Sequence, residues 1–555
     1  MCKQRSRPRA VPLVILLLGL ALLPGVLQTL SFSEREIPFL CNAENHYSVV
    51  VAPGDRLAAG FKLFTDITPR YGVLFPLIAA AWEKARGPLT MGEYVRIVCC
   101  LQVLFVCMAA FLYARYARGF LLPAGFAIIF LLPSFSTTGS QIYYPNLTGW
   151  RFLGFGMAAL ALLVFPQLSR RTGLFLVGAA AGLSLLMNFE TGLVIAVGYL
   201  MFLYIVERER FAACRKDAAT TAALLMGGFA VSLALWVLLV YLVLGYWPDL
   251  LGGFSRLLER LVTKVESSSA SGFKLFFDPL ALLAFFHAAY CLVSTCWSSS
   301  FAALGPRGAF RGAISTMILL WFSYYAMCPA SHNLVAICFL YGFLLVDMLR
   351  SIAVPARKQA IGFEQRLATV FLLSLVVIPF VTQLYAKQWP AYVKAVRSVM
   401  AGHAEFPARL VSGVYVPVGA AEKITEKACL LESLGKRGPV CYLTSHSLLM
   451  PKLSGVFSAG GINAARFQLK TEEARHDLIK ALAVSNCQYV LFDYPDESAR
   501  WGRRYAASAV ELRLELAPLF GRAFTAHGWE VWRRRKEGLS ESEHGEARPT
   551  LLAVP

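Results

Sequence analysis

Two acidic residues in the segment from residue 32 to residue 93 could do chemistry on a hydroxyl group. Glu44 and Asp66 both lie in this segment, and they could converge if the segment folds back on itself. Two carboxylates placed together can take the proton of a sugar hydroxyl or hold a divalent metal ion against a phosphate. The alternative is a solvated loop whose acidic residues cap helices, and the spacing of the two residues alone favours that alternative.

An arginine among aromatic residues forms a second candidate group. Tyr144 lies in a Tyr-Tyr-Pro string, and Arg151 follows between Trp150 and Phe152. A guanidinium at a membrane interface can bind a lipid phosphate through two parallel hydrogen bonds. The same residue types also form the belt that anchors a helix at the interface, so the sequence leaves both roles open.

Glu190 and His332 complete the set of polar candidates. Glu190 lies in the turn Asn188–Gly192 between two apolar runs, with no basic residue near it in sequence. An acid at membrane depth is costly unless it is used or paired, which favours a functional role. His332, between Ser331 and Asn333, is more often a helix-end hydrogen-bonding residue than a catalytic group. All these residues fall on one side of the predicted membrane, which indicates a single outward-facing site.

The composition indicates that membrane spans position these residues. The chain has 555 residues, of which 57% are hydrophobic and 16% are charged, whereas soluble chains carry about 25% charged residues. The net charge of +19 does not indicate nucleic-acid binding, because the basic residues lie in short loops and form no basic–aromatic face. The cysteines show no zinc-site spacing, and we interpret them as small hydrophobic residues.

The apolar runs predict about eleven transmembrane helices, since a helix needs about 20 apolar residues to cross the hydrocarbon. The first run is predicted to be a retained signal anchor, and the stretch 173–206 is predicted to divide in two. The expected spans are 11–31, 95–114, 119–134, 150–167, 173–189, 190–206, 219–244, 278–297, 312–328, 333–349 and 367–385.

The loop charges predict the orientation of these spans. Alternate loops are basic, whereas the short segments 135–149, 188–190 and 329–333 contain no Lys or Arg. Basic loops stay in the cytoplasm, so the N-terminus is predicted to be inside. An odd number of spans then places the C-terminal domain outside. The basic loops contain Arg115 and Arg118, Arg170 and Arg171, Arg208 to Lys216, Arg307 and Arg311, and Arg350 to Arg366.

The segment 391–535 is predicted to be a small α/β domain on the outer side, following a transmembrane domain of residues 1–390. Helices alternate with short apolar strands in it, which is typical of an α/β layer. No glycine-rich phosphate loop is present, so we do not predict a nucleotide site. The tail 536–555 is polar and predicted to be disordered. The expected elements are a helix at about 417–436, a strand at 439–443, a helix at 472–484, and strands at 489–492 and near 529–532.

Several short strings together resemble a known superfamily. The first outer segment resembles that of bacterial multi-spanning glycosyltransferases of the GT-C superfamily. Two later strings are similar to further short motifs of one branch of this superfamily. The long first loop, the span count and the C-terminal domain are similar too. The strings are Glu44-x-His46-Tyr47, Pro53, Gly60, Asp66, Tyr71-Gly72, then Tyr144-Pro145 with Arg151-Phe152, and Asn188 to Gly192.

The resemblance implies an inverting glycosyltransferase of the inner (plasma) membrane that moves a sugar from a polyprenyl-phosphate donor to an acceptor outside the cytoplasm. The acceptor would be a lipid, a glycan or a protein, and a divalent metal is a candidate cofactor. Glu44 or Asp66 would be the base. The donor phosphate or the substrate would contact Arg151, Tyr144, His46, Glu190 and His332. Protein O-mannosyltransferases carry an Asp-Glu or Asp-Asp pair, whereas the first acid here is Glu44, so the identity of the base stays open.

Two other classes of protein remain as alternatives. A transporter or flippase of lipid-linked sugars would also gather polar groups near spans, although such proteins tend to show repeated halves and polar groups at the midplane. A non-catalytic membrane scaffold would depend on its C-terminal domain instead. If Glu44, Asp66, Arg151 and Glu190 lined one outward cavity, the enzyme would be favoured.

The predicted orientation can be tested by labelling intact cells. We expect an impermeant reagent to label residues 60 and 450 from outside and to leave residue 212 unlabelled, because only the last lies in a basic inner loop. Labelling of residue 212 in intact cells would overturn the orientation and the single-site hypothesis with it.

Overall fold

The computed structural model divides into two compact units, which are described separately. A helical unit lies within Gly54–Leu89 and Glu93–Gly402, and a smaller unit lies mainly within His403–Pro555. The structure describes residues 50, 52–67, 69, 71–117, 148–213, 215–255, 279–297, 301–327, 333–353, 404–405, 415–416, 418–443, 449–459, 472–493 and 503–535.

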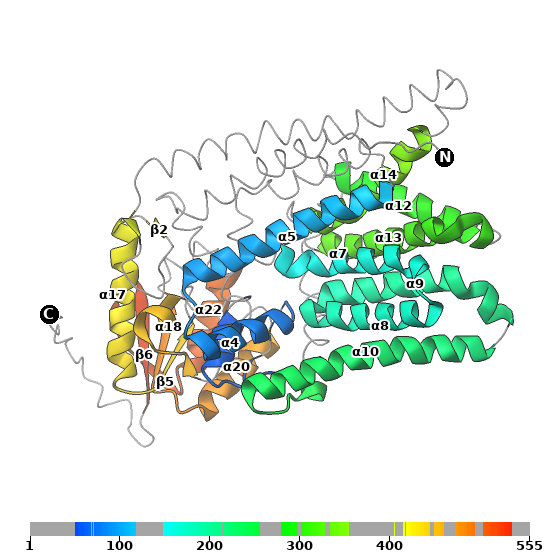
Figure 1. Cartoon of the computed structure of the whole chain (residues 1–555). Helices are drawn as coiled ribbons and strands as arrows, with labels where there is room; N and C mark the ends of the chain where they lie inside the picture. Colours follow the sequence, from blue (N-terminus) through cyan, green and yellow to red (C-terminus); the bar gives the residue numbers. More distant parts are fainter. Residues whose placement is uncertain are drawn as a thin grey trace. The chain divides into compact units, whose positions relative to one another are not determined.

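Long apolar helices dominate the helical unit (Figure 1). Five of the described helices are long and apolar enough to cross a membrane, and two shorter apolar helices accompany them, so the predicted multi-spanning helical fold is confirmed. The helices are α3 (Ala52–Ala58), α4 (Leu74–Arg86), α5 (Met91–Ala117), α7 (Gly149–Val164), α8 (Arg170–Met187), α9 (Phe189–Ala213), α10 (Arg215–Leu244), α12 (Pro279–Trp297), α13 (Phe301–Met327) and α14 (Leu334–Ala353), with the 3-10 turn η4 (Phe165–Gln167) after α7.

The predicted spans agree with these helices wherever the structure describes them. The stretch 173–206 divides as predicted, because α8 ends at Met187 and α9 begins at Phe189. In α13 the backbone is non-helical at Gly305, and the regular helix begins at Pro306. The predicted spans 11–31, 119–134 and 367–385 lie outside the described residues. The total of about eleven spans therefore stays a prediction.

The helix α14 lies at the centre of the bundle. Its residues from Leu334 to Val346 are all buried, as expected of a helix that is apolar on every side. Aromatic rings of α5 pack against it, and the Tyr113 hydroxyl donates a hydrogen bond of 2.6 Å to the Phe339 carbonyl oxygen. This helix fixes the positions of α5, α12 and α13 around it.

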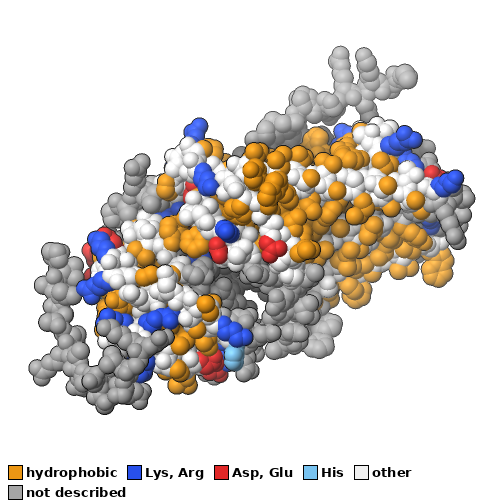
Figure 2. All heavy atoms as spheres, turned by 90° about the horizontal axis from the view of Figure 1, so that it is seen from below, with side chains coloured by type: hydrophobic (Ala, Val, Ile, Leu, Met, Phe, Trp, Pro, Cys, Tyr) orange, Lys and Arg blue, Asp and Glu red, His pale blue; other side chains and the backbone are white. Residues whose placement is uncertain are grey.

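Helices α8 and α10 approach each other through glycines. A Cβ atom on Gly178 would lie 2.1 Å from the carbonyl oxygen of Leu225, and one on Gly228 would lie 2.0 Å from that of Phe175. Small residues let helix backbones come this close, which is a usual way for helices to associate in membranes. The opposite face of α10 exposes large apolar side chains, and Figure 2 shows a broad apolar surface over this unit.

Polar contacts distinguish the two ends of the bundle. At one end, which we call the arginine-rich end, Arg115 donates a 2.8 Å hydrogen bond to Gln167 and Arg170 bonds Glu207 at 2.8–3.0 Å. Because α8 begins here, its other end lies at the opposite side of the bundle. There the first-loop residues Leu63 and Val73 pack with Leu186 and Trp236 in one apolar cluster, so the loop covers the ends of α8 and α10.

A four-stranded sheet forms the core of the smaller unit. Its strand order is β3-β4-β6-β5, with β3 and β4 parallel and the other pairs antiparallel. The predicted helices and strands of this domain are all present. The elements are β1 (Ala404–Glu405), β2 (Tyr415–Val416), α17 (Val418–Gly435), β3 (Val440–Leu443), α18 (Leu449–Ser454), α20 (Glu472–Val484), β4 (Tyr489–Asp493), α22 (Arg503–Leu516), β5 (Phe520–Ala526) and β6 (Trp529–Arg534).

Two features of this unit differ from the sequence analysis. The elements β1, β2, α18, α22 and β5 were not predicted from the sequence, although His527 and Gly528, both with positive φ, form the two-residue turn typical of a tight hairpin before β6. Our interpretation of every cysteine as a small hydrophobic residue was wrong for one pair. Cys441 on β3 and Cys487 before β4 form a disulfide, with Cα atoms 6.2 Å apart.

Adjacent glycines on α10 allow a matched test of the packing between α8 and α10. Gly228→Ala should lower the melting temperature in detergent, because overpacking costs about 1–3 kcal/mol. Gly227→Ala should be neutral or stabilising by up to about 1 kcal/mol, since it adds a helix-favouring residue and a Cβ atom there would meet nothing within 4 Å. If Gly228→Ala and Gly227→Ala changed the melting temperature equally, helices α8 and α10 would not approach each other closely at Gly228.

Candidate functional site

The turn between α8 and α9 is fixed by Asn188. Its Oδ1 atom accepts a 2.9 Å hydrogen bond from the backbone N–H of Thr191, so Asn188 caps the start of α9. Its Nδ2 atom donates to the carbonyl oxygen of Tyr71 at 3.2 Å. Asn188 is fully buried. One amide therefore shapes the helix start and holds the first loop against it.

The first loop reaches this turn because Gly72 has no side chain. Gly72 has φ +107°, and a Cβ atom on it would lie 2.0 Å from the carbonyl oxygen of Met187. The next residue, Val73, donates a 2.9 Å backbone hydrogen bond to Leu186. Two strings that stood out in the sequence, one in the first loop and one at residues 188–192, are thus in direct contact.

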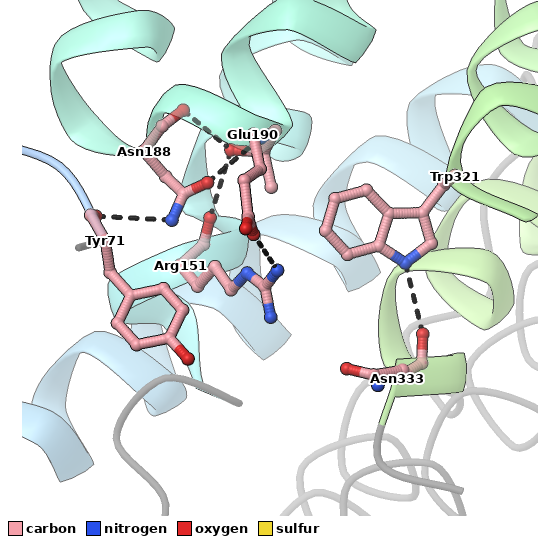
Figure 3. A network of polar contacts seen from close by, with 7 residues as sticks. Tyr71, Arg151, Asn188, Glu190, Trp321 and Asn333 are labelled. Atoms are coloured by element: carbon pink, nitrogen blue, oxygen red, sulfur yellow. Dashed lines mark hydrogen bonds and ion pairs between the residues drawn. The ribbon is translucent and has the colours of Figure 1, made fainter. Parts of the chain in front are cut away.

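Arg151 and Glu190 form a buried ion pair beside this turn (Figure 3). Arg151 lies in the first turn of α7, which is capped by the Thr148 side chain. Its Nη2 atom donates to the Glu190 carboxylate in the first turn of α9. The side chains are 1% and 12% exposed, respectively. Arg151 is the basic partner that the sequence near Glu190 does not provide.

Aromatic rings surround the Arg151 guanidinium. Its central carbon lies 5.3 Å from the ring centre of Tyr71, 5.5 Å from Phe152, 5.0 Å from Trp321 and 4.7 Å from Tyr324. Such contacts stabilise a cation where water is excluded. The sequence analysis missed Trp321 and Tyr324, because aromatic residues in a transmembrane run carry no signal of their own.

The guanidinium retains hydrogen-bonding capacity. The buried Nε atom of Arg151 has no hydrogen-bond partner among the described residues. A buried donor without a partner is costly, and such donors are rare in folded proteins. The start of α9 adds partial positive charge, because the backbone N–H groups of a first helical turn point outward along the axis. The Arg151 guanidinium could therefore donate a further hydrogen bond, from Nε, to an oxyanion next to the ion pair.

Asp66 lies in the first outer loop, as Tyr71 and Gly72 do, but its contacts are with other residues of this loop. Its Oδ2 atom accepts a 2.8 Å hydrogen bond from the backbone N–H of Lys62, which closes a turn. The Tyr246 hydroxyl accepts a hydrogen bond from the Leu63 backbone N–H at 2.5 Å. Burial raises the pKa of Tyr246, and the Asp66 charge acts in the same direction. Asp66 thus makes a local contact within a turn, at no end of α3 or α4, and it is exposed.

The described carboxylates that meet in the first outer segment are Asp55 and Glu83. The Tyr94 hydroxyl lies 2.6 Å from Asp55 Oδ1 and 3.0 Å from Glu83 Oε1, and both acids are buried. The Leu89 backbone N–H also donates to Glu83 Oε1. The sequence analysis did not single out these acids, because Tyr94 lies at the start of a predicted span and nothing local links the two.

The remaining predicted site residues lie outside the described part of the chain. These are Glu44, His46, Tyr144 and His332. Among the described residues, no group of three or more His, Cys, Asp or Glu side chains could hold a metal ion. Asp55 and Glu83 share Tyr94 instead.

Comparison with known proteins gives a distant likeness to one solved membrane enzyme. No protein-family description and no curated protein matches the chain. One similar structure is the archaeal oligosaccharyltransferase AglB from Archaeoglobus fulgidus in complex with an inhibitory peptide and a dolichol-phosphate. The two chains are 12% identical, with a TM-score of 0.42, and the match covers 95% of this chain and 75% of the AglB chain. The complex of the oligosaccharyltransferase from the same organism with Zn and sulfate has a TM-score of 0.39 and 13% identity over 88% and 69% of the two chains. At these identities and TM-scores the likeness is distant, and it assigns no residue of this chain a role.

A double-mutant cycle can measure the coupling within the ion pair. Arg151→Met and Glu190→Leu should each destabilise the protein strongly, because removing one partner of a buried pair costs about 3–5 kcal/mol. The double variant should lose much less stability than the sum of the losses in the two single variants, since it leaves no uncompensated charge. Melting in detergent would give the three values. Strictly additive losses would mean that the two side chains do not interact.

Proposed function

We propose that this protein is a membrane glycosyltransferase that moves a sugar from a polyprenyl-phosphate donor to an acceptor outside the cytoplasm. The observation that carries the proposal is the buried Arg151–Glu190 pair at the converging starts of α7 and α9, together with an Arg151 Nε donor that no described residue satisfies. A charge pair inside an apolar bundle is expensive to maintain and usually marks a site of function.

The proposed role of Arg151 follows from the charge changes of the reaction. When the sugar leaves a polyprenyl phosphate, negative charge develops on the departing phosphate oxygen. Fixed N–H donors stabilise such charge best where water is excluded. Glu190 holds one guanidinium nitrogen and fixes its orientation, while the Nε donor of Arg151 has no partner in the part of the chain that the structure describes. The pair therefore presents a donor to an oxyanion without burying an isolated charge.

The acceptor hydroxyl needs a base on the opposite face of the sugar in an inverting transfer. We assign this role to Glu44 or Asp66, which share the first outer loop. Asp66 is exposed at the end of the bundle where the loop covers α8 and α10. A proton lost by the hydroxyl would pass to this carboxylate as the new glycosidic bond forms.

The disulfide supports the proposed orientation. Disulfides persist in oxidising compartments and are rare in the cytoplasm. The pair Cys441–Cys487 lies in the C-terminal unit, which the loop charges of the sequence also place outside. These two observations are independent, because one rests on cysteine chemistry and the other on Lys and Arg in the helical unit.

Transfer assays on membranes test the proposed function. Membranes containing the protein, supplied with radiolabelled polyprenyl-phosphate sugars, should move label to an acceptor. Glu44→Gln or Asp66→Asn should lower this transfer by about a hundredfold or more, the usual loss for a positioned base. A suitable control is Asp249→Asn, because Asp249 is also a loop acid that accepts a backbone hydrogen bond, from Gly252 at 3.0 Å.

The outcomes are distinct. If none of the donors gives labelled product with the wild-type protein, the proposed reaction is wrong. If transfer occurs and both Glu44→Gln and Asp66→Asn retain the activity of Asp249→Asn, the base lies elsewhere and Asp66 has only its local contact within the turn.

A further inference from the structure

A second group of charges lies at the arginine-rich end of the bundle. Arg307 and Arg311 on α13 share one carboxylate, Asp347 on α14. The Nε atom of Arg307 lies 2.5 Å from Asp347 Oδ1, and the Nη1 atom of Arg311 lies 3.7 Å from Oδ2. Two guanidinium groups and one carboxylate leave a net positive charge, so the acid does not balance the cluster.

Several hydrogen-bond donors of this cluster are buried without a partner within the described ranges. They are the Nη2 atom of Arg307, the Nε atom of Arg311 and the hydroxyl of Tyr116. Tyr116, at the end of α5, is 5% exposed. The Arg307 guanidinium lies 4.5 Å above its ring. Burying so many unsatisfied donors in one place is unfavourable unless a ligand satisfies them.

The local backbone adds to the positive potential. The regular part of α13 begins at Pro306 after the non-helical Gly305, which puts Arg307 in the first turn. The start of a long helix carries partial positive charge and favours an anion. The side chains of Arg307 and Arg311 are 26% and 30% exposed, so the cluster lies at the edge of the bundle.

We propose that Arg307, Arg311 and Tyr116 bind a phosphate oxyanion, supplied by the headgroup of an anionic lipid or by free phosphate. The cluster lies at the end of the helices opposite to the Arg151–Glu190 pair. It is therefore distinct from the proposed donor site. With the predicted orientation, this end faces the cytoplasm, where anionic headgroups attract basic residues near the membrane surface. The ligand would hold α5, α13 and α14 together.

Melting of the delipidated full-length protein in detergent, with three added probes, tests this site. Phosphatidylglycerol should raise the melting temperature, and phosphatidylcholine should not. Arg311→Gln should weaken the apparent affinity for phosphatidylglycerol about tenfold, the usual loss for a charged hydrogen bond. Arg171→Gln, which removes an exposed charge at the start of α8, is the control and should bind like the wild type.

The third probe separates the two sources of the oxyanion. If inorganic phosphate raises the melting temperature of the wild type by as much as phosphatidylglycerol does, and if Arg311→Gln abolishes this rise, the ligand is free phosphate. Equal stabilisation of the wild type and Arg311→Gln by phosphatidylglycerol would overturn the proposal, as would no stabilisation by either probe.

A second variant keeps the test valid if Arg311→Gln folds poorly. Asp347→Asn retains both arginines and removes the carboxylate that competes for them, so it should bind phosphatidylglycerol at least as tightly as the wild type. If Asp347→Asn folds and binds phosphatidylglycerol much more weakly than the wild type, that result would also overturn the proposal.

Discussion

The helical unit depends on keeping one ion pair away from water and lipid. Arg151 and Glu190 come from different helices, and each needs the other because a single charge in an apolar bundle costs several kcal/mol. The aromatic rings of the first loop and of α13 close around the guanidinium. The starts of α7 and α9 therefore have a fixed register, and the loop cannot leave without exposing the charge.

The two ends of the bundle use arginine in different ways. At the end covered by the first loop, Arg151 is almost completely buried and its carboxylate partner is only slightly exposed. At the arginine-rich end, Arg307 and Arg311 outnumber their single carboxylate and remain partly exposed. A buried, balanced pair fixes geometry, whereas a partly exposed excess of charge attracts a counter-ion. The first arrangement suits the positioning of a reacting group and the second suits the binding of a membrane component.

The sequence predicted the long apolar helices and three of the six described strands, because apolar length and alternation are local properties. It missed what depends on contacts between distant residues. Glu190 looked isolated because Arg151 is 39 positions away, and the Asp55–Tyr94–Glu83 group joins acids that no motif connects. Cys441 and Cys487 pair only because β3 and β4 are neighbours in the sheet. Asp66 was found by its type, but only the structure shows its local contact within a turn.

The burial of α14 from Leu334 to Val346 has a consequence for the way the chain assembles. This helix follows α5, α7, α12 and α13 in the sequence, yet it fills the space among them. Helices that enter the bilayer during synthesis therefore cannot form their final contacts until this later segment has been made. A gap in the wall of the nascent bundle must stay open to admit it, filled for that time by lipid chains or by an insertion factor. The order of the helices along the chain thus sets a late step in membrane biogenesis.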